Sequence, residues 1–416
     1  MATKKQERKK MRKGWEEYTG AEISVRITKG ASPRWQGFEY QKTGCVFITS
    51  ENVRDGHLDT SKPKYLPIEF HKKQKNSQLT KNDILINIVG ASIGRVCMYD
   101  GRFEDANVNQ AVCIFRVSEK VSPDFLLYYF QAPYMQSNLL GSKSDSARPN
   151  LSLGDFNNFT FIIPPLAEQR KIAAILRTWD DAIKIHQTLV QAIRKKRKLI
   201  IQKSFAFDPA PLKRLSDVAD IIVSNVDKKS ISGQRHISLC NYMDVFNNRY
   251  ITSEVDFMVA TAADREIQTY ALQKDDAVFT KDSETPEEIA VCASVEEDIP
   301  NLICGYHLAI ARPDNKKILG AYLAEAINSP RVHQQFVKSA NGVTRFGLTR
   351  GDIDSIELPV PPIDKQEKTI GALRECDHAI KLIQAKIQNL QSQKRGLMQK
   401  LLTGQWHVKT SDVEAA

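Results

Sequence analysis

A helix-like stretch of this sequence occurs twice, about two hundred residues apart. The first copy begins PPLAEQRKIAAILRTWDDAI at residue 164, and the second begins PPIDKQEKTIGALRECDHAI at residue 361. At a constant offset of 197, 14 of the 40 positions in 164–203 are identical to those in 361–400. Ordinary residue frequencies would give roughly two or three identities by chance. The chain therefore contains an internal duplication, and its fold has to hold two equivalent helices.

The duplication extends upstream of both helices. At the same offset Leu151 matches Leu348, and the Gly-Asp pair at 154–155 matches that at 351–352. Further upstream the register slips by four, because KNDIL at 81–85 resembles KDDAV at 274–278. Beyond that point the two halves diverge. The order is therefore variable domain, shared helix, variable domain, shared helix.

Both shared segments have the apolar spacing of a coiled-coil helix. Apolar residues recur three and four positions apart, and Pro-Pro precedes each helix. We expect an antiparallel pair with pseudo-twofold symmetry, about 54 Å long, with Asp364 and Glu367 as a capping box and His186 packed in the stripe. The stripe residues are Ile172, Leu176, Trp179, Ile183, Val190, Ile193, Ile200, Leu373, Ile380, Ile383, Ile387, Leu390, Leu397 and Leu401, and the expected interface centres on Ile172, Leu176, Trp179, Ile183, Leu373, Ile380, Ile383 and Ile387.

The segments between the helices have the mixed pattern of α+β domains. In both, short β-rich runs are followed by a helical segment, such as SPDFLLYYFQAPYMQSNLL and ILGAYLAEAINSPRVHQQFVKS, and by one last strand. The predicted fold class is α+β, with two such domains separated by the two long helices. The predicted boundaries are a basic arm at 1–13, domains at 14–163 and 207–360, helices at 164–206 and 361–404, and a tail at 405–416.

The net charge of +10 suits a polyanionic partner. Two basic segments contribute to it: the N-terminal arm and the run from Arg194 to Lys198. The arm is either a solvated tail or a non-specific phosphate contact. The run is either a solvated helix face or a contact with DNA phosphates or a partner subunit.

Seven cysteines are irregularly spaced, and none forms a CxxC pair. This pattern argues against a disulfide framework and against a cysteine zinc site, and favours buried thiols in a reducing compartment. The sequence contains neither a secretory signal nor an apolar run of about 18 residues. We therefore expect a cytoplasmic protein that does not contact the membrane.

Polar loops in both variable domains carry side chains that suit DNA. Arg suits guanine, and Asn or Gln suits adenine, although polar loops are rich in these residues whatever they bind. In the first domain the candidates are Lys29, Arg34, Arg95, Asn107, Asn109, Gln110, Lys143, Arg148 and Asn150. In the second they are Asn225, Lys228, Lys229, Asn241, Lys281, His307, Asn341 and Arg345.

Motifs of the common DNA-modifying and nucleotide-hydrolysing enzymes do not occur. The Pro-Pro pairs lack the polar and aromatic neighbours of a base-holding methyltransferase loop. There is no GxGxxG before a helix, no GxxxxGK[ST] and no HExxH. PDNKK at 313–317 lacks the second acid of a nuclease core and is typical of a turn. The sequence thus predicts a binding protein, with no catalytic residue, metal or cofactor of its own.

The doubled P-P-[LI]-x-x-Q helix, the opening WEEYTGAEISVRITKGASP and LLTG at 401–404 resemble the specificity subunits of type I restriction–modification systems. The resemblance covers essentially the whole chain. It implies that each variable domain is a target recognition domain reading one half of a split, asymmetric DNA site in the major groove. It further implies that the helices fix the half-site separation and dock two methylase subunits.

The same resemblance assigns the chemistry to partner subunits. The methylase subunits use S-adenosylmethionine to methylate adenine, and the restriction subunits, which use ATP and Mg, bind the methylase core. The loops at 142–150 and 340–345 become the strongest candidates for base reading. The alternatives are a subunit of a related methylase-fused system, an enzyme with an unrecognised site, or a coiled-coil scaffold.

Overall fold

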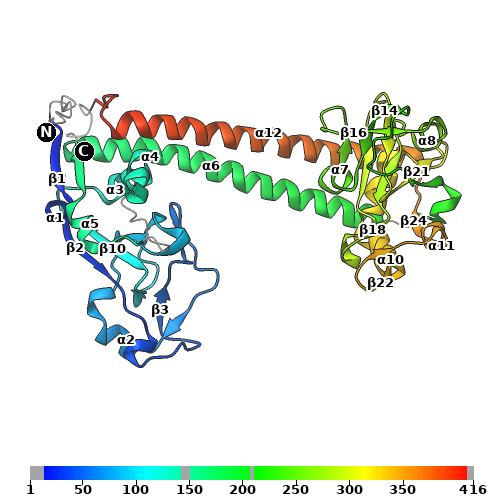
Figure 1. Cartoon of the computed structure of the whole chain (residues 1–416). Coiled ribbons are helices and arrows are strands. Elements are labelled where there is room, and N and C mark those ends of the chain that lie inside the picture. Colours follow the sequence, from blue (N-terminus) through cyan, green and yellow to red (C-terminus); the bar gives the residue numbers. More distant parts are fainter. Residues whose placement is uncertain (1–13, 142–149, 207–209, 410–416) are drawn as a thin grey trace. The chain divides into compact units, whose positions relative to one another are not determined.

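The computed structural model describes residues 14–141, 150–206 and 210–409, and contains two compact units (Figure 1). Unit 1 comprises residues 1–187 and 385–416, and unit 2 comprises residues 188–384. Each unit is an α+β domain with its share of the two long helices, which confirms the predicted fold class. The predicted arm at 1–13, the tail from residue 410, Lys143 and Arg148 lie outside the described residues.

Unit 1 is built on a four-stranded antiparallel sheet in the order β2-β10-β7-β8, beside a three-stranded sheet β6-β3-β9. Its strands are β1 (Glu16–Thr19), β2 (Ser24–Lys29), β3 (Cys45–Ile48), β4 (Val53–Arg54), β5 (His57–Leu58), β6 (Tyr65–Leu66), β7 (Ile84–Asn87), β8 (Val96–Met98), β9 (Ala106–Val108), β10 (Val112–Val117) and β11 (Thr160–Ile163). Its helices are α1 (Gly20–Ile23), α2 (Ile68–Lys73), α3 (Pro123–Gln131), α4 (Pro133–Gly141) and α5 (Leu153–Asn158), with short 3-10 turns η1 (Arg34–Gln36), η2 (Lys75–Ser77) and η3 (Gly90–Ser92).

Unit 2 repeats this plan with a five-stranded sheet β13-β21-β17-β19-β15 and a three-stranded sheet β16-β14-β20. Its strands are β12 (Leu212–Arg214), β13 (Ala219–Val223), β14 (Arg235–Cys240), β15 (Tyr250–Ile251), β16 (Met258–Ala262), β17 (Ala277–Thr280), β18 (Asp282–Ser283), β19 (Cys292–Val295), β20 (Leu302–Cys304), β21 (Leu308–Pro313), β22 (Asn341–Gly342), β23 (Phe346–Gly347) and β24 (Glu357–Pro359). Its helices are α7 (Tyr242–Asn247), α8 (Asp264–Tyr270), α9 (Gly320–Ile327), α10 (Pro330–Ser339) and α11 (Arg350–Asp354). It also contains a π-helical segment η4 (Gln202–Ala206) and the 3-10 turns η5 (Leu215–Asp217) and η6 (Pro286–Glu288).

The two units share a topology even where their sequences have diverged. Strands β2, β10, β7 and β8 correspond in order and pairing to β13, β21, β17 and β19. In the smaller sheets, β3 pairs with β9 in parallel, as β14 pairs with β20. A pair of a buried aspartate and a half-buried arginine also recurs, with Arg116 Nε 2.7 Å from Asp83 Oδ1 and Arg312 Nε 2.9 Å from Asp276 Oδ1. The duplication therefore covers the whole domain as well as the helix that the sequence repeats.

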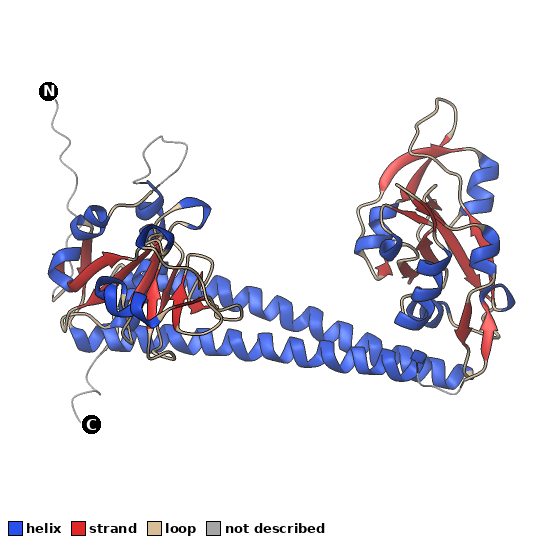
Figure 2. Cartoon of the chain, turned by 90° about the horizontal axis from the view of Figure 1, so that it is seen from below, coloured by secondary structure: helices blue, strands red, loops and turns tan. Residues whose placement is uncertain are grey.

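The long helices α6 (Leu166–Ile201) and α12 (Ile363–Leu402) lie side by side and antiparallel (Figures 1 and 2). In unit 1, Lys394 Nζ lies 2.5 Å from Asp180 Oδ1. In unit 2, Arg197 Nε lies 2.8 Å from Asp377 Oδ1. From Asp180 to Arg197 the residue number on α6 rises, while that of the partner on α12 falls from 394 to 377. The two helices therefore run in opposite directions. The antiparallel pairing is confirmed.

The apolar stripes also join the helices to the α+β domains. Ile172 and Leu176 are buried in the unit 1 core with Met398 and Leu401 of α12 and with residues of the sheet and α3. Leu373 is buried in the equivalent core of unit 2. Ile183 is also buried, whereas Trp179, Ile380, Ile383 and Ile387 are half-buried. Part of the predicted helix interface thus serves as the attachment of each helix pair to its own domain.

Two local predictions need correction. Asp364 lies inside the first turn of α12, where its Oδ2 is 3.6 Å from Lys368 Nζ, so it cannot be the capping residue. Capping boxes occur instead at Ser152–Asp155 and Thr349–Asp352, before α5 and α11. In the basic run, Arg197 is buried against acidic partners and does not belong to a solvated face. His186 is half-buried, and its Nδ1 lies 2.7 Å from the Ala182 carbonyl oxygen.

All seven cysteines lie in the described part of the chain, and all are free and buried, as predicted. Burial raises the pKa of the Cys97 thiol to about 12. Within the described residues, no helix has the length and apolar character needed to cross a membrane. The same residues hold no group of three or more His, Cys, Asp or Glu placed to bind a metal ion.

Candidate nucleic-acid interface

In unit 2, four predicted loops meet at one end of the main sheet. The Tyr306 N–H donates to the Val226 carbonyl (2.8 Å), which joins the loop after β13 to the loop before β21. Lys281 N–H donates to the His307 carbonyl (3.0 Å), and Leu348 N–H donates to the Lys281 carbonyl (3.0 Å). Backbone hydrogen bonds thereby bring together segments that are far apart in the sequence. We call this group of loops, 224–230, 281–284, 304–307 and 340–348, the unit 2 loop end.

Unit 1 has the same arrangement at the equivalent end of its sheet. The Gly30 N–H donates to the Asn109 carbonyl (3.1 Å), Ile88 N–H donates to the Ala111 carbonyl (3.0 Å), and Leu151 N–H donates to the Ile88 carbonyl (2.9 Å). The last two bonds correspond to the Lys281–His307 and Leu348–Lys281 bonds of unit 2. The loops concerned, 29–36, 88–95, 109–111 and 150–151, form the unit 1 loop end. Candidate residues from both ends of the first domain sequence are therefore brought to one surface.

Two glycines allow these loops to approach closely. A Cβ added to Gly30 would lie 1.7 Å from the Val108 carbonyl oxygen, and one added to Gly305 would lie 2.7 Å from the Cys240 carbonyl oxygen. Both distances are far below van der Waals contact, so a side chain at either position would push the loops apart. The glycines beside Lys29 and Tyr306 are thus required by the packing of the loop ends.

The unit 2 loop end carries an ordered polar and aromatic cluster. His307 Nδ1 lies 2.7 Å from Asp282 Oδ1, and Lys281 Nζ lies 3.5 Å from Asp282 Oδ2. Lys281 Nζ also lies 4.5 Å from the centroid of the Tyr306 ring, a cation–π distance. These contacts fix the Lys281 and His307 side chains beside Tyr306, whose side chain is half exposed. A preorganised cluster of this kind loses little conformational freedom on binding.

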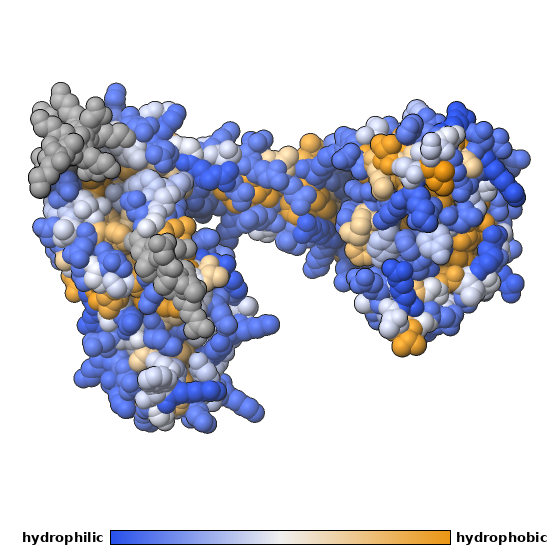
Figure 3. All heavy atoms as spheres, in the orientation of Figure 1, coloured by the Kyte–Doolittle hydropathy of each residue, from blue (hydrophilic) through white to orange (hydrophobic). Residues whose placement is uncertain are grey.

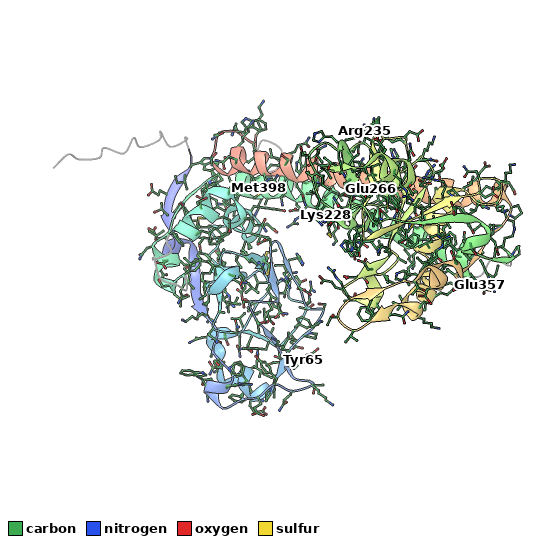
Figure 4. The ribbon with its side chains drawn as sticks, turned by 45° about the vertical axis from the view of Figure 1, so that its right-hand side comes forward. Tyr65, Lys228, Arg235, Glu266, Glu357 and Met398 are labelled. Atoms are coloured by element: carbon green, nitrogen blue, oxygen red, sulfur yellow. The ribbon has the colours of Figure 1, made fainter. Side chains whose placement is uncertain are left out.

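The remaining unit 2 candidates lie at or near the surface. Asn225, Lys228, Lys229, Asn341 and Arg345 are exposed, and Lys229 Nζ lies 2.8 Å from Asp227 Oδ2. Lys228 lies on the loop that follows β13 (Figure 4). Asn241 precedes α7 and is half-buried, with its Nδ2 donating to the Leu239 carbonyl (3.2 Å). The loop end therefore presents cations and amides to solvent together.

In unit 1 the candidates divide into exposed and buried residues. Lys29, Arg34, Gln110 and Asn150 are exposed, whereas Arg95 and Asn109 are half-buried.

Asn107 lies away from this surface. Its side chain is fully buried, with Nδ2 donating to Ser77 Oγ (2.8 Å) and Oδ1 lying 2.7 Å from His71 Nδ1. An amide that is inaccessible and already hydrogen-bonded inside the domain has no free group for a base, which counts against the predicted DNA contact at Asn107.

Several features of this surface were missed in the sequence. Trp35 is 90% exposed beside Arg34, and Val343 is 92% exposed at the tip of the β22–β23 hairpin. Tyr306 was also not singled out. The Arg116–Asp83 and Arg312–Asp276 pairs, at the opposite end of the main sheets, were missed as well. Hydrogen bonds to Asp83 raise the pKa of the Arg116 guanidinium, which stays charged and ties β10 to the turn before β7. A large apolar residue within a polar loop is the signal that could have identified Trp35 and Val343.

The fold and loop ends define a class of protein with two equivalent α+β units, each of which includes part of two long helices. Residues 12–195 and 212–392 match a family model described as the type I restriction modification DNA specificity domain. Because the two matches cover more than half of the chain, the chain belongs to this family.

Curated relatives show the same similarity along nearly the full length. The chain is 21% identical over 399 residues to the putative type I restriction enzyme MjaX specificity subunit of Methanocaldococcus jannaschii, covering 89% of each chain. It is 20% identical over 443 residues to the EcoKI specificity subunit of Escherichia coli, covering 97% of this chain and 92% of that one.

Solved structures share the fold. A chain from work on complex assembly and conformational transition of the type I R-M system superposes with a TM-score of 0.61 at 14% identity, covering 95% of this chain and 100% of that one. The S subunit of a type I restriction–modification system from M. genitalium gives a TM-score of 0.55 at 15% identity, covering 96% and 99%.

Proposed function

We propose that this chain is the non-catalytic DNA specificity subunit of a type I restriction–modification complex, in which each unit reads one half of a bipartite, asymmetric site. The observation that carries the proposal is the recurrence of the same four-loop surface at the equivalent end of both sheets. Two such surfaces with different side chains suit two half-sites with different sequences. Membership of the family supports this reading.

The loop ends have the chemistry that DNA binding requires. Lys29, Arg34 and Lys228 are exposed cations that can contact phosphates, which position a protein on DNA without reading sequence. Gln110 and Asn341 are exposed amides of the kind that pair with adenine edges in the major groove. Each loop end thus offers both a positioning and a reading function.

The two long helices would set the separation of the half-sites and dock two methylase subunits. The 36 residues of α6 correspond to about 54 Å of helix, which exceeds one turn of DNA, about 34–36 Å. Ile185 on α6 is 65% exposed, and Leu382, its equivalent at the offset of 197, is 57% exposed. Hydrophobic side chains reach the surface along the long helices in Figure 3. Apolar residues exposed at equivalent places suit two copies of one partner.

The chemistry of the complex would reside in the partner subunits. Under this proposal S-adenosylmethionine binds the methylase subunits, and ATP and Mg serve the restriction subunits. The present chain contributes DNA reading and assembly.

A footprinting experiment tests the proposal. The chain assembled with its methylase partner should protect two short patches separated by an unprotected spacer, on a DNA whose adenines it methylates. Exchanging residues 14–163 for the same domain of another specificity subunit should change one patch and leave the other unchanged. A single contiguous patch, or no sequence preference in the presence of the methylase, would reject the proposal.

The division of labour has its own test. Inserting four residues into both helices, about one helical turn each, should change the preferred spacer and keep both half-site sequences. A change in the half-site sequences would contradict the assignment of reading to the loop ends.

A further inference from the structure

A salt bridge between the two long helices occurs once in each unit, and it is formed by equivalent positions of the internal duplication. Asp180 and Asp377 are equivalent at the offset of 197, and so are Arg197 and Lys394. In unit 1 the acid is on α6 and the base on α12, with Lys394 Nζ 2.5 Å from Asp180 Oδ1. In unit 2 the acid is on α12 and the base on α6, with Arg197 Nε 2.8 Å from Asp377 Oδ1. The same pair thus occurs twice with the helices exchanged.

The second oxygen of each carboxylate reaches the α+β domain. The Tyr128 hydroxyl of α3 donates to Asp180 Oδ2 (2.7 Å), and the Tyr250 hydroxyl of β15 donates to Asp377 Oδ2 (2.8 Å). These tyrosines are not equivalent in the duplication, since the counterpart of Tyr128 is Glu325. Two different elements therefore supply the same contact to equivalent carboxylates.

The unit 2 site is largely shielded from solvent, whereas the unit 1 site is shielded on its lysine side only. The side chains of Arg197, Glu325 and Asp377 are 9%, 6% and 22% exposed. The side chain of Lys394 is 14% exposed, but that of Asp180 is 43% exposed. Burial and the hydrogen bond to its aspartate raise the pKa of each tyrosine hydroxyl, so both remain protonated donors at neutral pH. Charge-assisted hydrogen bonds are stronger than neutral ones, and shielding from solvent strengthens those of unit 2 further.

In unit 2 the contact is extended by a second acid. Arg197 Nη2 donates to Glu325 Oε1 (2.5 Å), and Arg249 Nη1 donates to the same oxygen (3.0 Å). Glu325 lies on α9 and Arg249 directly precedes β15, so the network joins the helix pair to two elements of the domain. In both units one aspartate links α6, α12 and the domain.

We infer that Asp180 and Asp377 are positioning residues that fix each recognition domain on its helix pair and thereby restrict the spacer lengths the chain accepts. This inference rests on the proposed function. Adding one base pair to the spacer moves a half-site by about 3.4 Å and turns it by about 34–36° around the duplex. A domain held by a hydrogen bond to a charged carboxylate of its helix pair resists the tilt needed to follow that change. A domain released from it follows the change more easily.

The test uses the chain assembled with its methylase partner and DNA in which the two half-sites are fixed and the spacer is varied by one or two base pairs. The variants Tyr128→Phe and Tyr250→Phe keep the ring and the inter-helix salt bridge. Tyr128→Phe removes the hydroxyl contact from Asp180 to its domain, and Tyr250→Phe removes the corresponding contact from Asp377, while the Arg197–Glu325 contact to α9 remains. Each should lower the discrimination between the preferred spacer and a spacer one base pair longer or shorter by about tenfold, the equivalent of a hydrogen bond to a charged group. The half-site sequences should not change.

Matched controls are Asp181→Ala and Glu375→Ala, which remove exposed carboxylates from the same helices. For these controls, the ratio of affinity for the preferred spacer to affinity for a spacer one base pair longer or shorter should equal that of the wild type. We call the affinities across these spacers the spacer profile. Asp180→Ala and Asp377→Ala form a second set, which removes each carboxylate and with it both the tyrosine hydrogen bond and the inter-helix salt bridge, and should broaden the range of accepted spacers at least as much.

Two results would overturn the inference and leave the proposed function standing. One is a folded set of tyrosine and aspartate variants whose spacer profile equals that of the wild type. The other is an altered half-site sequence at an unaltered spacer. A wild-type complex that shows no bipartite preference at all would reject the proposed function itself.

Discussion

Replacing Gln169 or Gln366 by Leu should destabilise one unit at a time. These are the equivalent glutamines of the two Pro-Pro-x-x-x-Gln segments, and their side chains are 1% and 0% exposed. Gln169 Oε1 accepts from the Ser122 N–H (2.8 Å), and its Nε2 donates to the Lys120 (3.0 Å) and Pro164 (2.8 Å) carbonyls.

The contacts recur in unit 2. Gln366 Oε1 accepts from the Leu319 N–H (2.9 Å), and its Nε2 donates to the Lys317 (2.9 Å) and Pro361 (2.8 Å) carbonyls. Each glutamine therefore links the start of a long helix to a segment of its own domain. Gln169 contacts the residues just before α3, and Gln366 contacts the residues just before α9.

The expected size of the effect follows from the groups left without partners. Leucine has nearly the same volume as glutamine, so the change leaves no large cavity, but it deprives one backbone N–H and two carbonyls of their partner. An unsatisfied buried group costs about 1–3 kcal/mol, and the carbonyls retain their second lone pair for other contacts. We expect a loss of about 3–6 kcal/mol in the free energy of unfolding of the affected unit.

The tryptophans allow the two units to be followed separately. Trp15, Trp35, Trp179 and Trp406 all lie in unit 1. In urea unfolding, Gln169→Leu should shift the transition seen by tryptophan fluorescence to lower urea. Gln366→Leu should shift the transition seen by far-ultraviolet circular dichroism, with a much smaller shift in fluorescence. Arg170→Leu, at an exposed neighbouring position, serves as the control.

A loss below about 1 kcal/mol for both variants would refute this reasoning, because the net contribution of the three hydrogen bonds would then not exceed that of one ordinary hydrogen bond. Equal shifts of both signals for each variant would refute the assignment of one glutamine to one unit.

Three further predictions concern charge and burial. Lys228→Ala should reduce the slope of log affinity for DNA against log salt by about 0.9, with the sequence preference unchanged, as measured by fluorescence anisotropy at several salt concentrations. Asp83→Asn should destabilise unit 1 by about 3 kcal/mol in urea unfolding, since it leaves the Arg116 guanidinium without its charged partner, whereas Asp100→Asn at the surface should cost less than about 1 kcal/mol. Because burial raises the pKa of Cys97 to about 12, its thiol should resist a thiol reagent at neutral pH in the native chain and react after unfolding, which mass spectrometry of the labelled peptide would detect.

Much of the architecture could be predicted from the sequence because it is encoded in repetition and local pattern. The repeated Pro-Pro segments and their apolar spacing predicted both long helices, which span Leu166–Ile201 and Ile363–Leu402. The β-rich runs coincide with strands, and the helical segment of each domain is present but divides at a proline, as at Pro133 and Pro330. A proline fits the first turn of a new helix but not the interior of a long one.

The candidate site was predicted only in part. The loops were identified from composition, and the structure brings them together at one end of each sheet through bonds such as Lys281 N–H to the His307 carbonyl. Asn107 and Arg197 are buried, which the sequence did not indicate, because a polar side chain in a loop-like or basic segment gives no sign of its burial. Burial depends on strands and helices distant in the sequence, which a local pattern does not contain.

The duplication, the two helices and the α+β class could be predicted from the sequence, because each is encoded in residue types at regular spacing, and the family was suggested by the resemblance of the doubled Pro-Pro segments. Which residues share a surface, and which carboxylate joins three elements, depends on tertiary packing. Asp180 and its neighbour Asp181 are the same residue type on the same helix, yet Asp180 contacts Tyr128 and Lys394, and Asp181 is exposed. Adjacent positions on a helix point about 100° apart, so their surroundings are set by what packs against each face.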